Sequence, residues 1–193
     1  MNTSLWDSLL QPAVAIVPSS HDGDTRLHAM VSYGYEGDGA VETELQKADI
    51  RMINAQNCLG WTPLHCAAAS CYYNGVQALL QAGADPFLRT NEPAGCNALH
   101  LAASSGEGCS DIIRLLLQSA AAARTSTAGT NEIPPAVRLH LDPLVQLLTA
   151  LDGRGASALA IAASRANPES KDGAAAVQCI EAICEHMPGL QLR

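Results

Sequence analysis

One stretch near the middle of the chain decides the fold: Asn57-Cys-Leu-Gly-Trp-Thr-Pro-Leu-His65, followed later by Ala82-Gly-Ala-Asp85. Thr62 is of a residue type that caps helices by accepting a hydrogen bond from an unpaired backbone N–H. Pro63 suits the first helical position, where its missing N–H removes no bond. Gly83 is a typical left-handed end for a second helix. The stretch therefore predicts two short helices joined by a tight turn.

The same helix start occurs four times along the chain. The copies read Thr25-Arg-Leu-His28, Thr62-Pro-Leu-His65, Asn97-Ala-Leu-His100 and Ser157-Ala-Leu-Ala160. Alanine pairs such as Ala67-Ala68 and Ala102-Ala103 follow these starts and allow neighbouring helices to approach closely. We therefore expect the helices to stack in layers, with each unit burying its apolar side against the next.

These motifs resemble the ankyrin repeat, whose unit reads D-x-x-G-x-T-P-L-H and closes with G-A-D. The resemblance implies an all-α solenoid of stacked helix–turn–helix units with short hairpin fingers and one long helical insertion. It divides the chain into an N-terminal capping segment and an ankyrin-repeat domain. The predicted ranges are 1–19 for the cap, 20–193 for the domain, 20–56, 57–91, 92–122 and 152–187 for the repeats, and 123–151 for the insertion.

The insertion contains an apolar stripe that begins at Asp142-Pro143 and includes Leu144 and Leu148. Asp142 is a good N-cap and Pro143 fits the first helical position, so an additional helix is expected. Two interpretations stay open. The helix projects beside the concave face, where Leu144 and Leu148 would contact a partner, or it is the outer helix of a decayed repeat.

Composition and charge exclude several classes of function. The 193 residues are 48% hydrophobic with a formal net charge of −8, which has the wrong sign for binding nucleic acid. The early apolar run Pro12–Val17 is too short to span a membrane. Seven cysteines without a C-x-x-C pair indicate mostly reduced, buried thiols. We expect a reducing compartment, cytoplasmic or nuclear, and a large assembly such as a cytoskeletal one as a candidate location.

The sequence contains no constellation typical of an enzyme, so no catalytic residue, cofactor or small-molecule substrate is predicted. His28, His65 and His100 recur at one repeat position, and the resemblance implies that each imidazole bonds to the neighbouring repeat. Structural roles are also expected for Thr62, Pro63 and Gly83. Zinc binding by His65, Cys66 and Cys71 is the alternative, but their spacing fits no known structural site, so no metal is predicted.

The resemblance places the binding surface on the finger tips and on the exposed side of the inner helices. Trp61 is the leading candidate because tryptophan is enriched in interface hot spots, although it could instead fold over the neighbouring finger. The other partner-binding candidates at these positions are Cys58, Leu59, Asp22, Asp24, Tyr33 and Arg154.

Two functional classes follow from this reading. The first is a non-catalytic protein-interaction scaffold, either a small adaptor or a subunit of a larger multi-subunit assembly. The alternative is an ankyrin-type inhibitor or assembly chaperone that binds a kinase or a proteasome-like partner. A fold does not choose between them, because function depends on the surface that the fold carries.

Overall fold

A computed structural model of the chain describes residues 23–32, 39–106, 108–126, 142–166 and 173–187. Within these ranges the chain is helical and has no strand beyond one isolated bridge between Leu151 and Ser157. The predicted all-α fold is therefore confirmed. The capping segment 1–19, Asp22 and Tyr33 lie outside the described residues.

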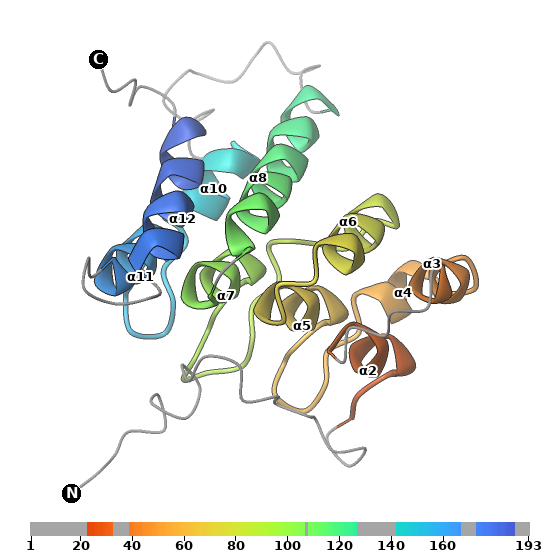
Figure 1. Cartoon of the computed structure of the whole chain (residues 1–193). Helices are drawn as coiled ribbons and strands as arrows, with labels where there is room; N and C mark the ends of the chain where they lie inside the picture. The colour runs from red at the N-terminus through yellow and green to blue at the C-terminus, as the bar shows by residue number, and fades with distance from the viewer. Residues whose placement is uncertain (1–22, 33–38, 107, 127–141, 167–172, 188–193) are drawn as a thin grey trace, which may run out of the picture.

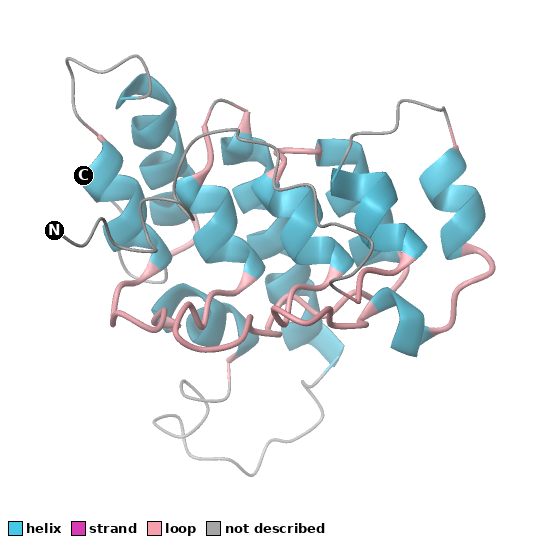
Figure 2. Ribbon diagram, turned by 90° about the horizontal axis from the view of Figure 1, so that it is seen from below, coloured by secondary structure: helices cyan, strands magenta, loops and turns pink. Residues whose placement is uncertain are grey.

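The helices form two layers (Figures 1 and 2). The inner layer consists of α2 (Arg26–Ser32), α5 (Pro63–Ala69), α7 (Ala98–Ser104) and α11 (Ala158–Arg165), and each contacts the next. The outer layer consists of α3 (Ala40–Leu45), α6 (Tyr73–Gln81), α8 (Cys109–Ser126) and α12 (Gly173–Glu185), stacked in the same order. A short helix, α4 (Ile50–Ile53), links the first pair to the second. We number the repeats by these four pairs of inner and outer helices.

The inner helices begin where the sequence places their caps. Thr62 accepts a hydrogen bond through Oγ1 from the His65 backbone N–H at 3.4 Å, and Asn97 Oδ1 accepts one from His100 N at 3.1 Å. Ser157 Oγ does the same for Ala160 N at 3.3 Å. Each cap satisfies a backbone donor that has no partner inside its helix, which fixes the residue at which the helix starts.

The core lies between the two layers and continues through all repeats. Leu64, Leu79 and Leu99 have exposed fractions of at most 1%, and Ile112 and Leu116 on α8 are fully buried. The small residues of the inner helices, Ala67, Ala68, Ala102, Ala103 and Ala162, are also fully buried. Their size lets adjacent inner helices pack closely, so every repeat depends on its neighbours for burial.

The described part of the insertion packs against the outer layer. Helix α8 has 18 residues against nine in α6, and α10 (Pro143–Thr149) lies against it. Leu144 and Leu148 are only 4% and 6% exposed. The prediction that these two leucines contact a partner beside the concave face is therefore wrong, because α8 covers the apolar stripe of α10.

A disulfide joins Cys71, in the turn of the second repeat, to Cys109 at the start of α8 in the third. The sequence predicts mostly reduced, buried thiols without a disulfide framework, and this pair is an exception to that prediction. Their sequence separation of 38 gives no hint of contact, because repeat stacking alone brings the turn of one unit beside the outer helix of the next. Cys58, Cys66, Cys96, Cys179 and Cys184 are free thiols.

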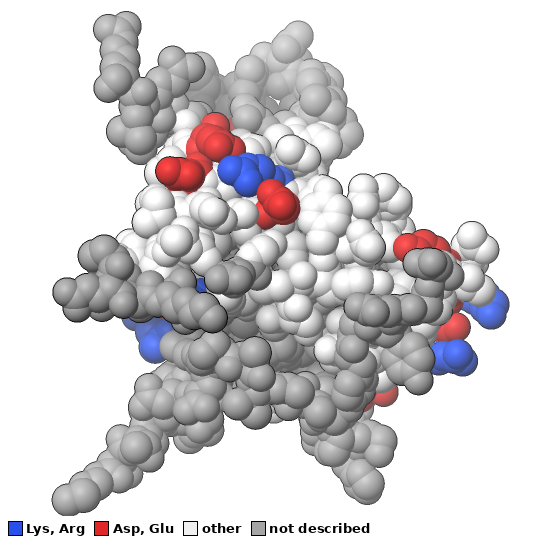
Figure 3. Space-filling view, in the orientation of Figure 1, with Lys and Arg blue, Asp and Glu red and all other residues white. Residues whose placement is uncertain are grey.

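On the face drawn in Figure 3, charged side chains of both signs gather over α8 and α12 and at the end that carries α2–α4. On α8, Arg114 forms ion pairs with Asp111 and with Glu185 of α12, both at 3.1 Å. Exposed pairs of this kind contribute little to stability, because solvent screens them. The charges therefore assist the stacking of the third and fourth repeats, whereas the buried core dominates it.

Candidate protein-interaction surface

Three finger loops connect successive repeats: Asn57–Trp61, Thr90–Cys96 and Leu151–Ser157. Asn57 shapes the first by accepting hydrogen bonds through Oδ1 from Leu59 N at 3.0 Å and Trp61 N at 2.9 Å. Asp152 shapes the third in the same way, accepting from Arg154 N at 2.9 Å and Ala156 N at 2.8 Å. One side chain therefore fixes the backbone of the first loop, and another fixes that of the third. We call the three loops, together with the adjoining side of the inner helices, the finger face.

Hydrogen bonds tie each finger to the next. The Asn91 backbone N–H donates to Leu59 O at 3.0 Å, and its side chain donates to Cys58 O at 3.0 Å. Gly153 N donates to Ala94 O at 2.8 Å, which joins the second finger to the third. Because these bonds hold the loops in one arrangement, little conformational entropy is left to lose when a partner binds.

The three repeat histidines connect the inner helices to the fingers. In each, Nδ1 accepts a hydrogen bond from the backbone N–H of the capping residue, so Nε2 carries the proton and donates it to a carbonyl in the following finger or directly before it. His28 donates to Trp61 O at 2.8 Å, His65 to Cys96 O at 3.2 Å and His100 to Ala150 O at 3.0 Å.

Burial keeps these imidazoles neutral. Removal from water lowers the pKa of His28 and His100, and it lowers the pKa of His65 to about 4. A neutral ring has one donor and one acceptor nitrogen, and in all three residues both nitrogens are engaged. These side chains therefore have no free atom for catalysis or for a metal. No group of three or more metal-binding side chains exists among the described residues.

Trp61 lies half-buried at the edge of a hollow on the finger face. Its ring centroid is 6.4 Å from that of His65, at an interplanar angle of 51°. The hollow opens to solvent, and the apolar part of its lining includes Trp61, Ala94, Leu101 and Ile161. The ring packs on the core and also lines this hollow, so contact of Trp61 with a partner stays a prediction.

The other predicted partner-binding residues differ in their accessibility. Leu59 is 50% exposed, and Cys58 beside it is exposed. Arg154 is exposed and lies with Nε 3.6 Å from Asp152 Oδ2, at the rim of the hollow. Asp24 already serves the fold, since its Oδ1 accepts a hydrogen bond from Asn57 Nδ2 at 2.8 Å.

Sequence reasoning missed Leu101 and Ile161 as lining residues and Arg89 as a link between fingers. Leu101 and Ile161 follow the third and fourth helix starts at the position that Cys66 occupies in the second. An alignment of the repeats would have placed Leu101 and Ile161 at the same repeat position. Arg89 donates from Nε to Gly95 O at 2.8 Å and from Nη2 to Leu151 O. Its contacts have no signal in the sequence, because they join loops far apart along the chain.

Comparison with known proteins places the chain in a family. The family described as ankyrin repeats (3 copies) matches residues 3–90 and 27–128, which together make up more than half of the chain. The protein therefore belongs to the ankyrin-repeat family, whose members are modules for protein–protein interaction.

Individual relatives match part of the chain. Human NF-kappa-B inhibitor alpha is 35% identical over 100 residues, covering 52% of this chain and 30% of the relative. The pig protein of the same name is 34% identical over 99 residues, covering 51% and 30%. A Caenorhabditis elegans ANK repeat-containing protein, nipk-1, is 27% identical over 126 residues, covering 62% and 20%. The chain thus spans less than a third of the length of these relatives. Among its described residues, no helix is long and apolar enough to cross a membrane.

Proposed function

We propose that the protein is a non-catalytic binding scaffold that holds a partner on its finger face, with an apolar side chain of the partner in the hollow beside Trp61. The observation that carries this proposal is the hollow itself, which Trp61 shares with Leu101 and Ile161 from the next two repeats. Half-buried aromatic residues in such positions supply most of the energy of many interfaces. Leu59, exposed on the adjacent finger, extends the apolar contact.

The contacts between fingers also support this proposal. The bonds of Asn91 to Leu59 and Cys58, and of Gly153 to Ala94, hold the rim of the hollow in place before a partner arrives. A rigid surface of this kind binds with a smaller entropic cost than loops that must be ordered. Arg154 at the rim adds a polar contact that would select the orientation of the bound segment.

Capture of partners from the native source by the full chain, followed by measurement of affinity with the purified partner, tests the proposal. We expect Trp61→Ala to weaken binding by roughly 30-fold or more and Leu59→Ala by less. Tyr73→Ala is the matched control, because Tyr73 is also exposed, at 40%, but lies on α6 away from the fingers. Equal affinities of Trp61→Ala and Tyr73→Ala would reject the finger face as the binding surface.

A second candidate is an inhibitor, which the resemblance to proteins named NF-kappa-B inhibitor alpha favours over an assembly chaperone. The aligned region covers 30% of those relatives, so the target cannot be transferred with the fold. Titration of purified NF-kappa-B with this chain is a direct test. Saturable binding that Trp61→Ala weakens would support the inhibitor class, and absence of binding would leave the scaffold with a different partner.

The proposal also includes a cellular location. We place the protein in the cytoplasm or nucleus, because five of its cysteines are free thiols, as is typical of a reducing compartment. Membership in a large multi-subunit assembly predicts that the protein in a native extract elutes at a mass far above that of the purified protein. Size-exclusion chromatography of a native extract separates this arrangement from a free monomer or a small complex.

A further inference from the structure

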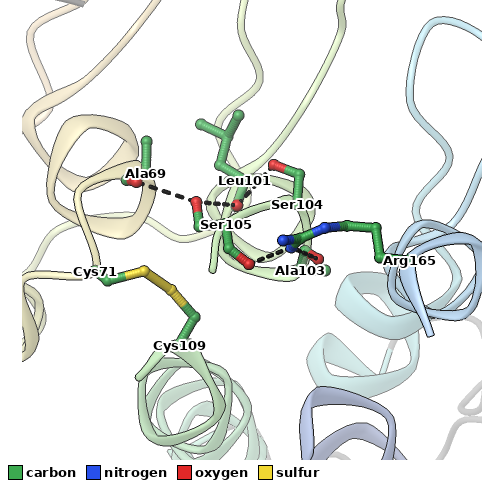
Figure 4. The surroundings of a disulfide bond; sticks show 8 residues. All are labelled: Ala69, Cys71, Leu101, Ala103, Ser104, Ser105, Cys109 and Arg165. Carbon is green, nitrogen blue, oxygen red and sulfur yellow. Dashed lines mark hydrogen bonds between the residues drawn. A yellow bond between two sulfur atoms is a disulfide. The ribbon is translucent and has the colours of Figure 1, made fainter. Parts of the chain in front are cut away.

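The edge of the solenoid opposite the fingers is held together between repeats. The turns between inner and outer helices lie there, and we call this side the turn edge. Figure 4 shows the part of it around the disulfide. Ser105 donates through Oγ to Ala69 O at 3.0 Å, from the third repeat to the second. Arg165 of the fourth repeat donates to Ala103 O at 3.3 Å and to Ser105 O. The Cys71–Cys109 bond lies on this edge and is its one covalent link among the described residues.

We propose that Cys71 and Cys109 form a reversible redox site that locks the interface between the second and third repeats. Their Cα atoms are 5.3 Å apart, within the range that a disulfide spans without moving the backbone. The inner helices α5 and α7 and the outer helices α6 and α8 meet at this same interface. The proposal does not depend on the identity of a partner, because neither sulfur lies on the finger face.

The surroundings of the two sulfurs differ, so an incoming thiolate can reach one sulfur more easily than the other. Cys71 is half-buried, whereas Cys109 is fully buried at the first residue of α8. An incoming thiolate therefore reaches the bond from the Cys71 side. The sulfur of Cys109 then leaves at the start of α8 and takes up a proton, because burial disfavours its thiolate form.

Hydrogen peroxide can form this disulfide, and glutathione can reduce it. In closing, one hydrogen peroxide oxidises the two thiols: a thiolate becomes a sulfenic acid and releases hydroxide, and the second thiol displaces water to form the S–S bond. In opening, one glutathione thiolate forms a mixed disulfide with Cys71 and a second glutathione displaces it. The products are oxidised glutathione and the two protein thiols.

Three of the other cysteines compete poorly for this chemistry. Burial raises the pKa of Cys66 to about 12 and that of Cys96 to about 11, and it also raises the pKa of Cys179. The thiolate is the reactive form, so these residues hold little of it near neutral pH. Cys58 is exposed at a finger tip and far along the inner helix from the turn edge, which makes it a suitable control.

The disulfide should affect how the protein unfolds, because the stability of a repeat array depends on the interfaces between repeats. In a stacked array each repeat contacts only its neighbours, so weakening one interface allows the two sides to open separately. A covalent link between residues 38 positions apart restricts the unfolded chain strongly. We therefore expect the oxidised protein to melt as one unit and the reduced protein to open first between α5 and α7.

The test uses the full chain in three states: treated with one equivalent of peroxide, treated with millimolar reduced glutathione, and untreated. Non-reducing peptide mapping should show the Cys71–Cys109 link after peroxide and its loss after glutathione. Reduction should lower the melting temperature by on the order of 10 °C, with helix content at room temperature unchanged. Hydrogen exchange should rise in α5 and α7 on reduction.

Two variants make the result specific. Cys71→Gly removes the sulfur and also relieves the positive φ of +51° at this position, so it should fold and should melt identically with and without reductant. Cys58→Ser should behave like the wild type in every state. The proposal is overturned if peroxide leaves the two cysteines unlinked, if glutathione fails to open the bond in the folded chain, or if Cys71→Gly keeps the dependence on reductant.

Discussion

Acidification should destabilise this protein through its buried histidines, and His65 allows the size of the effect to be worked out. His65 is 1% exposed, and burial lowers its pKa from the ordinary 6.5 to about 4. Between these two values the unfolded chain binds a proton at this residue and the folded chain does not. Stability from this source is therefore complete above about pH 6.5 and is lost as the pH falls toward 4.

The gap of about 2.5 pH units corresponds to about 3 kcal/mol at 1.36 kcal/mol per unit. Roughly 2 kcal/mol of this should disappear between pH 7 and pH 5, before most carboxylates take up protons. The lowered pKa values of His28 and His100 act in the same direction. For a domain with a typical total stability of about 5–15 kcal/mol, the loss is large enough to measure.

Urea denaturation at a series of pH values between about 7 and 4 measures the effect. His65→Gln should be less stable than the wild type at neutral pH, since it removes the bond to Cys96 O, but it should lose less stability on acidification. His186→Gln controls for the loss of one histidine, because that ring lies just after α12 and contacts a nearby carbonyl, Ala182 O. Equal pH slopes for the wild type and His65→Gln would refute the reasoning. A nuclear magnetic resonance titration of the His65 ring in the wild type gives the same answer without a variant.

Three further substitutions test the packing and the fingers, each by urea or thermal denaturation. Leu64→Ala should destabilise the chain by roughly 2–5 kcal/mol, because Leu64 is 1% exposed in the central layer, and a melting curve like that of the wild type would contradict the assigned register. Gly60→Ala should cost more than about 1 kcal/mol, because Gly60 has φ +75° and an added Cβ would lie 2.5 Å from Asn91 N. Leu148→Ala should lower stability by about 2–4 kcal/mol if α10 belongs to the core, whereas an effect near zero would return α10 to the exposed surface.

The sequence predicted the helices best where local chemistry decides them. The caps at Thr62, Asn97 and Ser157 and the proline at 63 act within a few residues, so the starts of α5, α7 and α11 could be read directly. The histidine contacts needed the repeat pattern as well, since each ring reaches a finger about 31 to 50 residues away.

The errors concern residues whose role depends on what lies beside them in space. The stripe containing Leu144 and Leu148 showed that one side of α10 is apolar, but a stripe looks the same whether a partner or α8 covers it. Likewise, Cys71 and Cys109 carry no spacing signal, and only stacking brings them together. The hollow beside Trp61 needs side chains from three repeats, so no single motif contains it.

The two edges of the solenoid have different proposed roles, one in binding a partner and the other in holding the repeats together. Each inner helix begins at a finger and ends at a turn, so α5 carries Thr62 and Trp61 at one end and Ser70 and Cys71 at the other. The finger edge presents the hollow and is tied by hydrogen bonds that a partner can extend, whereas the turn edge holds the covalent link and the Arg165 contacts. A change at the turn edge therefore alters how firmly neighbouring repeats are held together without touching the atoms that would contact a partner. The lining of the hollow comes from three repeats, so loosening the second repeat from the third would still change the shape of the hollow. We therefore expect the redox state of Cys71 and Cys109 to alter the binding surface through repeat packing alone.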